Sequence, residues 1–196
     1  MTGERMEGAA PEEREMPTGR RNSQGIRIDP ETEAELEERR AVISALVDHE
    51  PGVLANVSGL FARRQLNIES LTVGPTIDES KARMTIVVEE DEPGIEQAKR
   101  QLRKEVHAWS VREVRGAIER ELALIKVHGD DPAGVSALAE MYDGEAIQGD
   151  DGILTVQLTG TEAEIDAAIE AFEQFGVHEV ARTGTAALAS GTQSTT

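Results

Sequence analysis

The 196-residue sequence contains no cysteine, few aromatic residues and a large deficit of basic side chains. The lack of cysteine excludes disulfides, thiol nucleophiles and cysteine-ligated zinc. The aromatic residues are three Phe, one Trp and one Tyr, and the hydrophobic fraction is 38%. Any core must therefore be built mainly from Val, Ile, Leu and Ala, and a small domain with such a core often depends on a partner chain.

The charge balance is strongly acidic, with 38 Asp and Glu against 20 Lys and Arg and a net charge of -18. A surface of this sign repels phosphate groups, so neither nucleic acid nor an anionic membrane is expected as a partner. Lysine occurs only at Lys81, Lys99, Lys104 and Lys126. This acid-rich, lysine-poor balance resembles proteins of salt-accumulating halophiles. The alternative, an acidic interaction tail, is disfavoured because the charge is spread over the whole chain.

Long apolar runs are also missing, since none approaches the roughly 20 residues of a membrane span. Residues 1–40 lack the apolar core of a signal peptide, so we expect a cytoplasmic protein. Residues 1–36 are rich in Gly, Pro, Glu and Arg, and we expect them to form a disordered extension. Within and just beyond this stretch, Pro30 to Arg40 is a candidate for a short helix capped by Asp29.

The sequence offers no pattern typical of a catalytic or metal centre. The four histidines are far apart and never four residues apart on one helix, so no metal site is expected: His49, His107, His128 and His178. Clustered acids such as Glu89 to Glu92 are typical of solvated turns. We therefore predict no catalytic residue and no cofactor in this chain.

Hydrophobic periodicity predicts the order strand, helix, strand, strand, helix, strand twice. In the first half the strands are expected at Ala41–Asp48, Asn67–Thr76, Ala82–Glu90 and Trp109–Val114, with helices after Pro51 and over Glu92–Val106. In the second half they are expected at Glu121–Gly129, Gly144–Gln148, Gly152–Gly160 and Val177–Arg182, with helices over Asp131–Tyr142 and after Thr161. Thr161 and Glu164 have the spacing of a capping box.

This order is the split βαβ arrangement called ferredoxin-like, so the predicted fold class is α+β with two βαββαβ domains. We place the boundaries at 1–36 for the extension, 37–116 and 117–191 for the domains, and 192–196 for a frayed tail.

The run SALVDHEPGVLANVSGLFARRQLNIESLTVGPT, residues 44–76, resembles an ACT domain, the ferredoxin-like module that senses amino acids. GLFARRxxNIESLTVGPT followed by RMTIVV is similar to the particular pattern of acetolactate synthase small subunits. Further along, IERELALIKV, LTVQLTGT and VHEVARTG resemble the second domain of that family. The resemblance extends over about residues 40–191, in register.

The resemblance implies a non-catalytic regulatory subunit in branched-chain amino-acid biosynthesis. Such a subunit stimulates a catalytic large subunit and mediates feedback inhibition by valine or another branched-chain amino acid. It implies a homodimer in which two ACT domains pair side by side with the effector at their interface. It also implies thiamine diphosphate and Mg²⁺ in the catalytic partner, with FAD as a further candidate there.

For the effector site the resemblance points to His49, Gly52, Val53, Leu54, Asn67, Thr72 and Gly74. Backbone N–H groups at a helix start suit a carboxylate, and Gly52 to Leu54 open the predicted helix. The amide of Asn67 offers donors and an acceptor, and the resemblance implies that it faces the ligand from the partner chain. His49 replaces the Asn of bacterial members, which affects how strongly this chain responds to valine.

Two alternatives remain at this stage. An ACT-type sensor acting on a transcriptional or other metabolic partner would share the PGVL turn but predicts a DNA-binding or foreign catalytic segment. A ferredoxin-like acyl-phosphate hydrolase would need a phosphate-cradling loop with Arg and Asn together, whereas the HEPGV turn is acidic.

Overall fold

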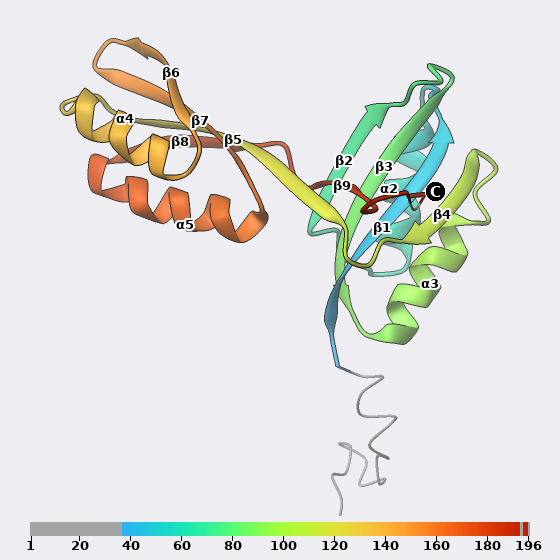
Figure 1. Ribbon diagram of the computed structural model, residues 1–196. Coiled ribbons are helices and arrows are strands. Elements are labelled where there is room, and N and C mark those ends of the chain that lie inside the picture. The colour runs from blue at the N-terminus through green and yellow to red at the C-terminus, as the bar shows by residue number, and fades with distance from the viewer. Residues whose placement is uncertain (1–36, 193, 196) are drawn as a thin grey trace, which may run out of the picture. The chain divides into compact units, whose positions relative to one another are not determined.

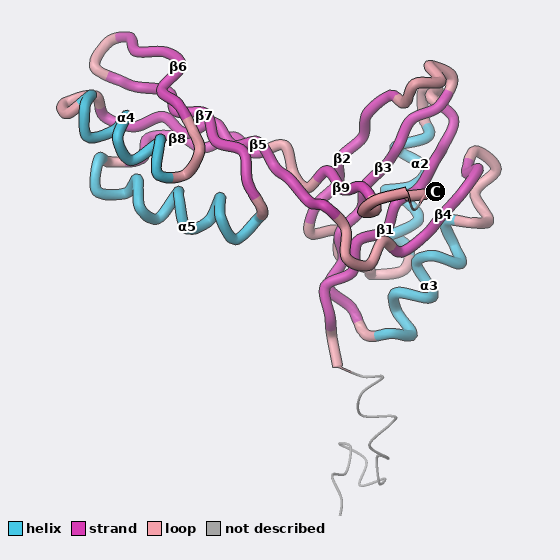
Figure 2. Tube along the Cα trace, in the orientation of Figure 1, coloured by secondary structure: helices cyan, strands magenta, loops and turns pink. Residues whose placement is uncertain are grey.

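The computed structural model describes residues 37–192, 194 and 195. The predicted extension 1–36 lies outside these residues, as does most of the candidate helix over Pro30 to Arg40. Within them the chain forms two α+β domains, each an antiparallel sheet with two helices (Figures 1 and 2). The predicted fold class, two ferredoxin-like βαββαβ domains, is confirmed.

The first domain has a four-stranded sheet in the order β2-β3-β1-β4, with all neighbouring strands antiparallel. Its elements are β1 (Arg39–Asp48), α2 (Val53–Arg63), β2 (Ser70–Pro75), β3 (Lys81–Glu90), α3 (Glu92–Leu102) and β4 (Ala108–Glu113).

The second domain repeats this arrangement with the order β6-β7-β5-β8. Its elements are β5 (Ile118–His128), α4 (Pro132–Met141), β6 (Glu145–Asp150), β7 (Ile153–Gly160), α5 (Glu162–Phe172), the 3-10 turn η1 (Glu173–Phe175) and β8 (Val177–Arg182). A further short strand, β9 (Ala186–Leu188), pairs with the first residues of β5.

Alternation along the strands explains how the first sheet receives its helices. On β1, Ile43, Ala45 and Val47 are buried in the core with Phe61 of α2 and Ile95 of α3. The residues between them point to the other face, because successive side chains of a strand alternate. The apolar stripe on α2 and the inward-facing residues of the strands thus pack against each other in one core.

The two helices of the first domain start differently, whereas both helices of the second domain start with a side-chain cap. Asp91, Asp131 and Thr161 cap α3, α4 and α5 by accepting a backbone N–H bond, and Thr161 with Glu164 forms the predicted capping box. Helix α2 instead begins after Gly52, which has φ 92° and no side-chain cap. Among the described α-helices, only α2 therefore starts without a side chain on its first N–H groups.

Most element boundaries differ from the sequence expectations by a few residues, and three of these differences concern the first domain's sheet and site. Arg39 and Arg40, expected to end a short helix, open β1, where they lie opposite Glu90 and Glu89 of β3. Arg39 forms ion pairs there with Glu92 and Glu113, which favour this extension of the sheet. Asn67 precedes β2 instead of opening it, and α3 ends at Leu102.

The segment after β8 returns to the helix-free face of the first sheet. Ala187 is buried there against Val42 and Val87. The hydroxyl of Ser70 accepts the N–H of Thr185 at 2.8 Å. Near the chain end, Thr195 is also buried and accepts the N–H of Ala189. Residues 185–189 therefore contribute to the first domain as well as the second.

In the part of the chain that the structure describes, none of the helices has the length and hydrophobicity needed to cross a membrane.

Candidate functional site

The start of α2 presents backbone donors at the surface. The N–H of Val53 contacts the Glu50 carbonyl at 3.4 Å, and the N–H of Asn56 donates to the Gly52 carbonyl at 2.9 Å. Among the described residues, the N–H groups of Leu54 and Ala55 have no acceptor, and the first turn contains no acidic residue. Free N–H groups and the positive end of the helix dipole together favour a small anion at this point.

The turn before α2 is tied to the neighbouring β2–β3 turn. The N–H of His49 donates to the Ser80 carbonyl at 2.8 Å, and its Nδ1 lies 3.3 Å from the Glu79 carbonyl. Val53 is buried in the core, whereas Leu54 is 46% exposed. The turn therefore has a fixed backbone and an apolar side chain beside its free N–H groups.

Asn67 is exposed in the loop between α2 and β2, and its amide donates to the Glu69 carboxylate at 2.5 Å. Within the described chain, no hydrogen bond joins it to the α2 start.

Thr72 and Gly74 lie on β2, opposite Thr85 and Arg83 of β3. Both line a groove on the helix-free face of the sheet. The structure thus divides the seven predicted residues into three places: four at the α2 turn, Asn67 in its loop, and Thr72 and Gly74 in this groove.

A charged cluster that the sequence did not indicate surrounds Glu113, whose side chain is only 7% exposed. Arg39, Lys99 and Arg115 approach its carboxylate to between 2.8 and 3.0 Å. Burial raises the pKa of Glu113, but the hydrogen bonds from these cations outweigh it and lower the pKa to about 2. Glu92 and Glu96 offer further carboxylates close by, within 4.8 Å of the Glu113 oxygen. Because the same cations pair with them, the cluster is a set of internal ion pairs.

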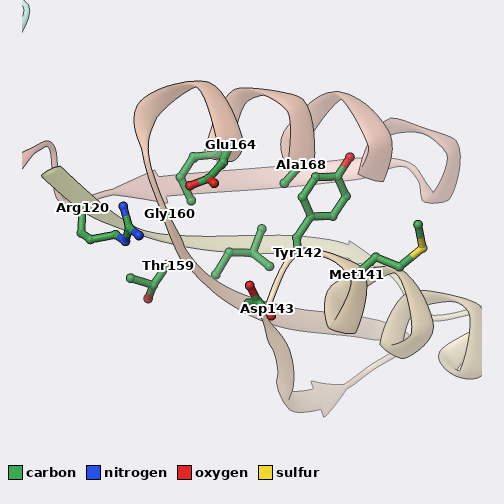
Figure 3. Close-up of a pocket in the computed structure, with 10 residues that line it drawn as sticks. Arg120, Met141, Tyr142, Asp143, Thr159, Gly160, Glu164 and Ala168 are labelled. Carbon is green, nitrogen blue, oxygen red and sulfur yellow. The ribbon is translucent and has the colours of Figure 1, made fainter. Parts of the chain in front are cut away.

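The second domain contains a hollow of about 310 Å³ between β7, α5 and the loop after α4 (Figure 3). Glu164, one of its polar groups, is held by the N–H and hydroxyl of Thr161, and the Tyr142 hydroxyl lies 3.4 Å from the Ala167 carbonyl. These polar groups are used within the domain, and no sequence pattern singled out this region as a site.

Comparison with known proteins is consistent across both domains. Residues 43–108 match the family model described as AHAS small subunit-like ACT domain, and residues 120–191 match that of the small subunit of acetolactate synthase. A probable acetolactate synthase small subunit of Methanothermobacter thermautotrophicus is 39% identical over 164 residues, which cover 81% of this chain and 98% of that protein. The chain belongs to the acetolactate synthase small-subunit family.

Other members show the same extent of similarity. The acetolactate synthase small subunit of Bacillus subtilis is 36% identical over 159 residues, covering 79% of this chain and 92% of that protein. The crystal structure of the acetolactate synthase small subunit from Thermotoga maritima has a TM-score of 0.72 at 36% identity, covering 76% and 96% of the two chains. The small-subunit family therefore shares the two-domain fold described above.

Proposed function

We propose that this chain is the regulatory subunit of an acetolactate synthase and performs no chemistry itself. It binds and stimulates a catalytic subunit that carries thiamine diphosphate and Mg²⁺, with FAD as a further candidate. It also transmits feedback inhibition by valine or another branched-chain amino acid. Membership of the small-subunit family supports the assembly, and the α2 start supports the sensing.

The uncapped start of α2 is the observation that carries the sensing proposal. The other described α-helices have a side-chain oxygen on their first N–H groups, whereas α2 leaves Leu54 and Ala55 without one. An amino-acid carboxylate supplies the missing acceptor and gains from the helix dipole. The exposed Leu54 side chain provides apolar contact for an aliphatic effector.

A homodimer completes this site in the proposal. The exposed amide of Asn67 comes from a second copy and binds polar groups of the effector. Strand β2 lies at the edge of its sheet and exposes Val73, so a neighbouring copy has an available edge beside this loop. Thr72 and Gly74, assigned to the effector by resemblance, lie on β2 and line the groove on the helix-free face. We place this assembly in the cytoplasm.

Effector and catalytic subunit must influence each other reciprocally. If valine changes the affinity between the subunits by some factor, the catalytic subunit changes the affinity for valine by the same factor. A valine titration of the chain alone and of the complex therefore measures the coupling directly.

The test mixes the full chain with its catalytic subunit and measures acetolactate formation with and without valine, leucine or isoleucine. It is run at low and high salt because a net charge of -18 is self-repulsive, and salt screens this repulsion. Stimulation by the chain and inhibition by one of these amino acids are expected. Unchanged activity in the mixture rejects the regulatory role.

Comparing Gly52→Asp with Gly52→Ala distinguishes the effect of a negative charge at the effector site from the effect of backbone strain. Both variants place a side chain at φ 92°, where the added Cβ would meet no atom within 4 Å, so they share the same backbone strain. Only Asp adds a carboxylate against that of the ligand, and we expect it to weaken effector binding about tenfold beyond Ala. Equal effector affinities in the two variants would show that the effector carboxylate does not bind at the start of α2.

A further inference from the structure

The groove on the helix-free face of the first sheet has a volume of about 840 Å³, which is within the range of small-molecule sites. Its floor includes Leu46, Arg83 and Thr85, and its walls include residues of β5, β9 and the loop after β2. The α2 turn and Asn67 do not line it. The groove is therefore separate from the proposed effector site.

Arg83 is a cation in this groove without a counter-ion. Its guanidinium donates to the hydroxyl of Ser44 at 3.0 Å, and Ser44 is fully buried. Among the described residues, no carboxylate forms an ion pair with it, and burial lowers its pKa. In a chain of net charge -18, a half-buried arginine beside a cavity and without an acidic partner is suited to an external anion.

The other charged groups in the groove lining are Arg120, which donates to the Glu119 carbonyl at 2.9 Å and forms no ion pair among the described residues, and the pair of Lys81 and Asp78. Lys81 pairs with Asp78 at 3.1 Å and lies 4.7 Å above the ring of Trp109. Asp78, the acidic residue among those that line the groove, also accepts the hydroxyl and N–H of Ser80. A ligand ammonium would therefore have to compete with Lys81 for this carboxylate.

The walls expose apolar side chains. Ile118 of β5 and Leu188 of β9 lie opposite each other in the strand pair and are 57% and 56% exposed. Ile77, in the loop after β2, is fully exposed. Covering such surface with an aliphatic group is favourable at about 25 cal/mol per Å².

We propose that the groove binds a small monocarboxylate with a branched aliphatic tail, with its carboxylate on Arg83 and its tail against Ile118 and Leu188. The absence of an ammonium distinguishes this ligand class from the amino acid proposed at α2. Part of the wall belongs to the segment that joins the two domains, because the Thr185 hydroxyl, next to β9, donates to the buried Glu121 of β5 at 2.7 Å.

The test measures binding of 3-methylbutanoate to the full chain by calorimetry at high ionic strength, and by NMR shifts of the arginine Nε–H groups. Arg83→Gln is expected to weaken binding at least tenfold, since it removes a charge-assisted hydrogen bond. Arg112→Gln is the matched control. Arg112 lies on β4, opposite Ser44 of β1, and does not line the groove. Its substitution removes the same charge, so binding should be unchanged.

Other ligands and substitutions at exposed positions test the same site without relying on a variant that could misfold. Acetate should bind more weakly because it lacks the tail, and 3-methylbutylamine should not bind. Leu188→Asp places a carboxylate on an exposed wall position and should abolish binding without disturbing a core residue. Arg83→Lys keeps the charge and should retain part of the affinity.

Several outcomes would overturn the proposal. Affinity unchanged in both Arg83→Gln and Leu188→Asp would show that the carboxylate binds elsewhere. Loss of binding in Gly52→Asp but not in Gly52→Ala would place it at the α2 start. Failure of any carboxylate to bind, with sedimentation showing a dimer that dissociates in Leu188→Asp, would show that a second copy occupies the groove. Amino-acid inhibition is measured separately with the catalytic subunit, so failure of the groove proposal and failure of the regulatory role are distinguishable.

Discussion

Glu113→Gln tests how much the ion-pair cluster stabilises the first domain. The substitution keeps the shape of the side chain but removes its charge, leaving Lys99, whose side chain is 8% exposed, with Glu96 as its carboxylate partner. Lowering the pKa of Glu113 from 4.5 to about 2 corresponds to about 3 kcal/mol, at about 1.4 kcal/mol for each pKa unit. Loss of one partner of a buried pair costs a similar amount, about 3 to 5 kcal/mol.

The pH dependence follows from the direction of this shift. Because the folded-state pKa is lowered, the stabilisation is complete above pH 4.5 and is lost as the pH falls towards 2. Urea unfolding followed by the fluorescence of Trp109, the single tryptophan, reports on the first domain. The difference between the wild type and Glu113→Gln should be constant from neutral pH to about pH 5 and narrow below it.

Glu89→Gln provides the control, since Glu89 is an exposed residue of β3 that forms no ion pair among the described residues. It should change the free energy of unfolding by less than about 0.5 kcal/mol. If both variants lose the same stability, or if the penalty at Glu113 is independent of pH, the ion pairs do not contribute as described.

The remaining predictions concern a helix cap, a core and the joining segment. Thr161→Ala removes the hydroxyl that accepts the Glu164 N–H but keeps the backbone N–H that donates to the Glu164 carboxylate, and it should cost about 1 kcal/mol in urea unfolding followed by circular dichroism; no change would show that Glu164 caps α5 alone. Phe61→Ala should cost about 3 to 5 kcal/mol in unfolding followed by Trp109 fluorescence, and a loss below about 1 kcal/mol would mean that the core collapses into the space. Thr185→Val leaves one hydrogen bond of the buried Glu121 unmade and should cost about 1 to 3 kcal/mol in thermal unfolding, whereas unchanged stability would show that Arg182 alone satisfies this carboxylate.

The sequence was sufficient for the fold because the local pattern and the packing agree. The stripe that includes Val57 and Phe61 and the alternation around Ile43 each predict the face that the structure buries. Gly52 could be singled out for the same reason, since a helix start with a glycine and no capping side chain is a local feature.

Features assembled from distant parts of the chain could not be predicted in this way. The cluster around Glu113 combines β1, α3 and β4, and no spacing in the sequence joins Arg39 to Glu113. Strand β9 has only three residues, Ala186, Ala187 and Leu188, which is too short for a recognisable strand pattern. Its middle residue, Ala187, pairs with Glu119 of β5, which lies 68 positions earlier in the sequence. Burial of Ser44 and Thr85 on the second face of the sheet follows from these long-range contacts.

The return of residues 185–188 to the first sheet has a consequence for synthesis of the protein. Domains generally fold as units, with the N-terminal one first as the chain is made. Here Ala187 and the Thr185–Ser70 hydrogen bond complete the first domain with residues from the last part of the chain. A nascent chain can therefore form the β1–β4 sheet early, but the contacts of Val42 and Val87 with Ala187 cannot form until residues 185–188 have been made. During this interval Val42 and Val87 are open to contact with other chains or with a chaperone.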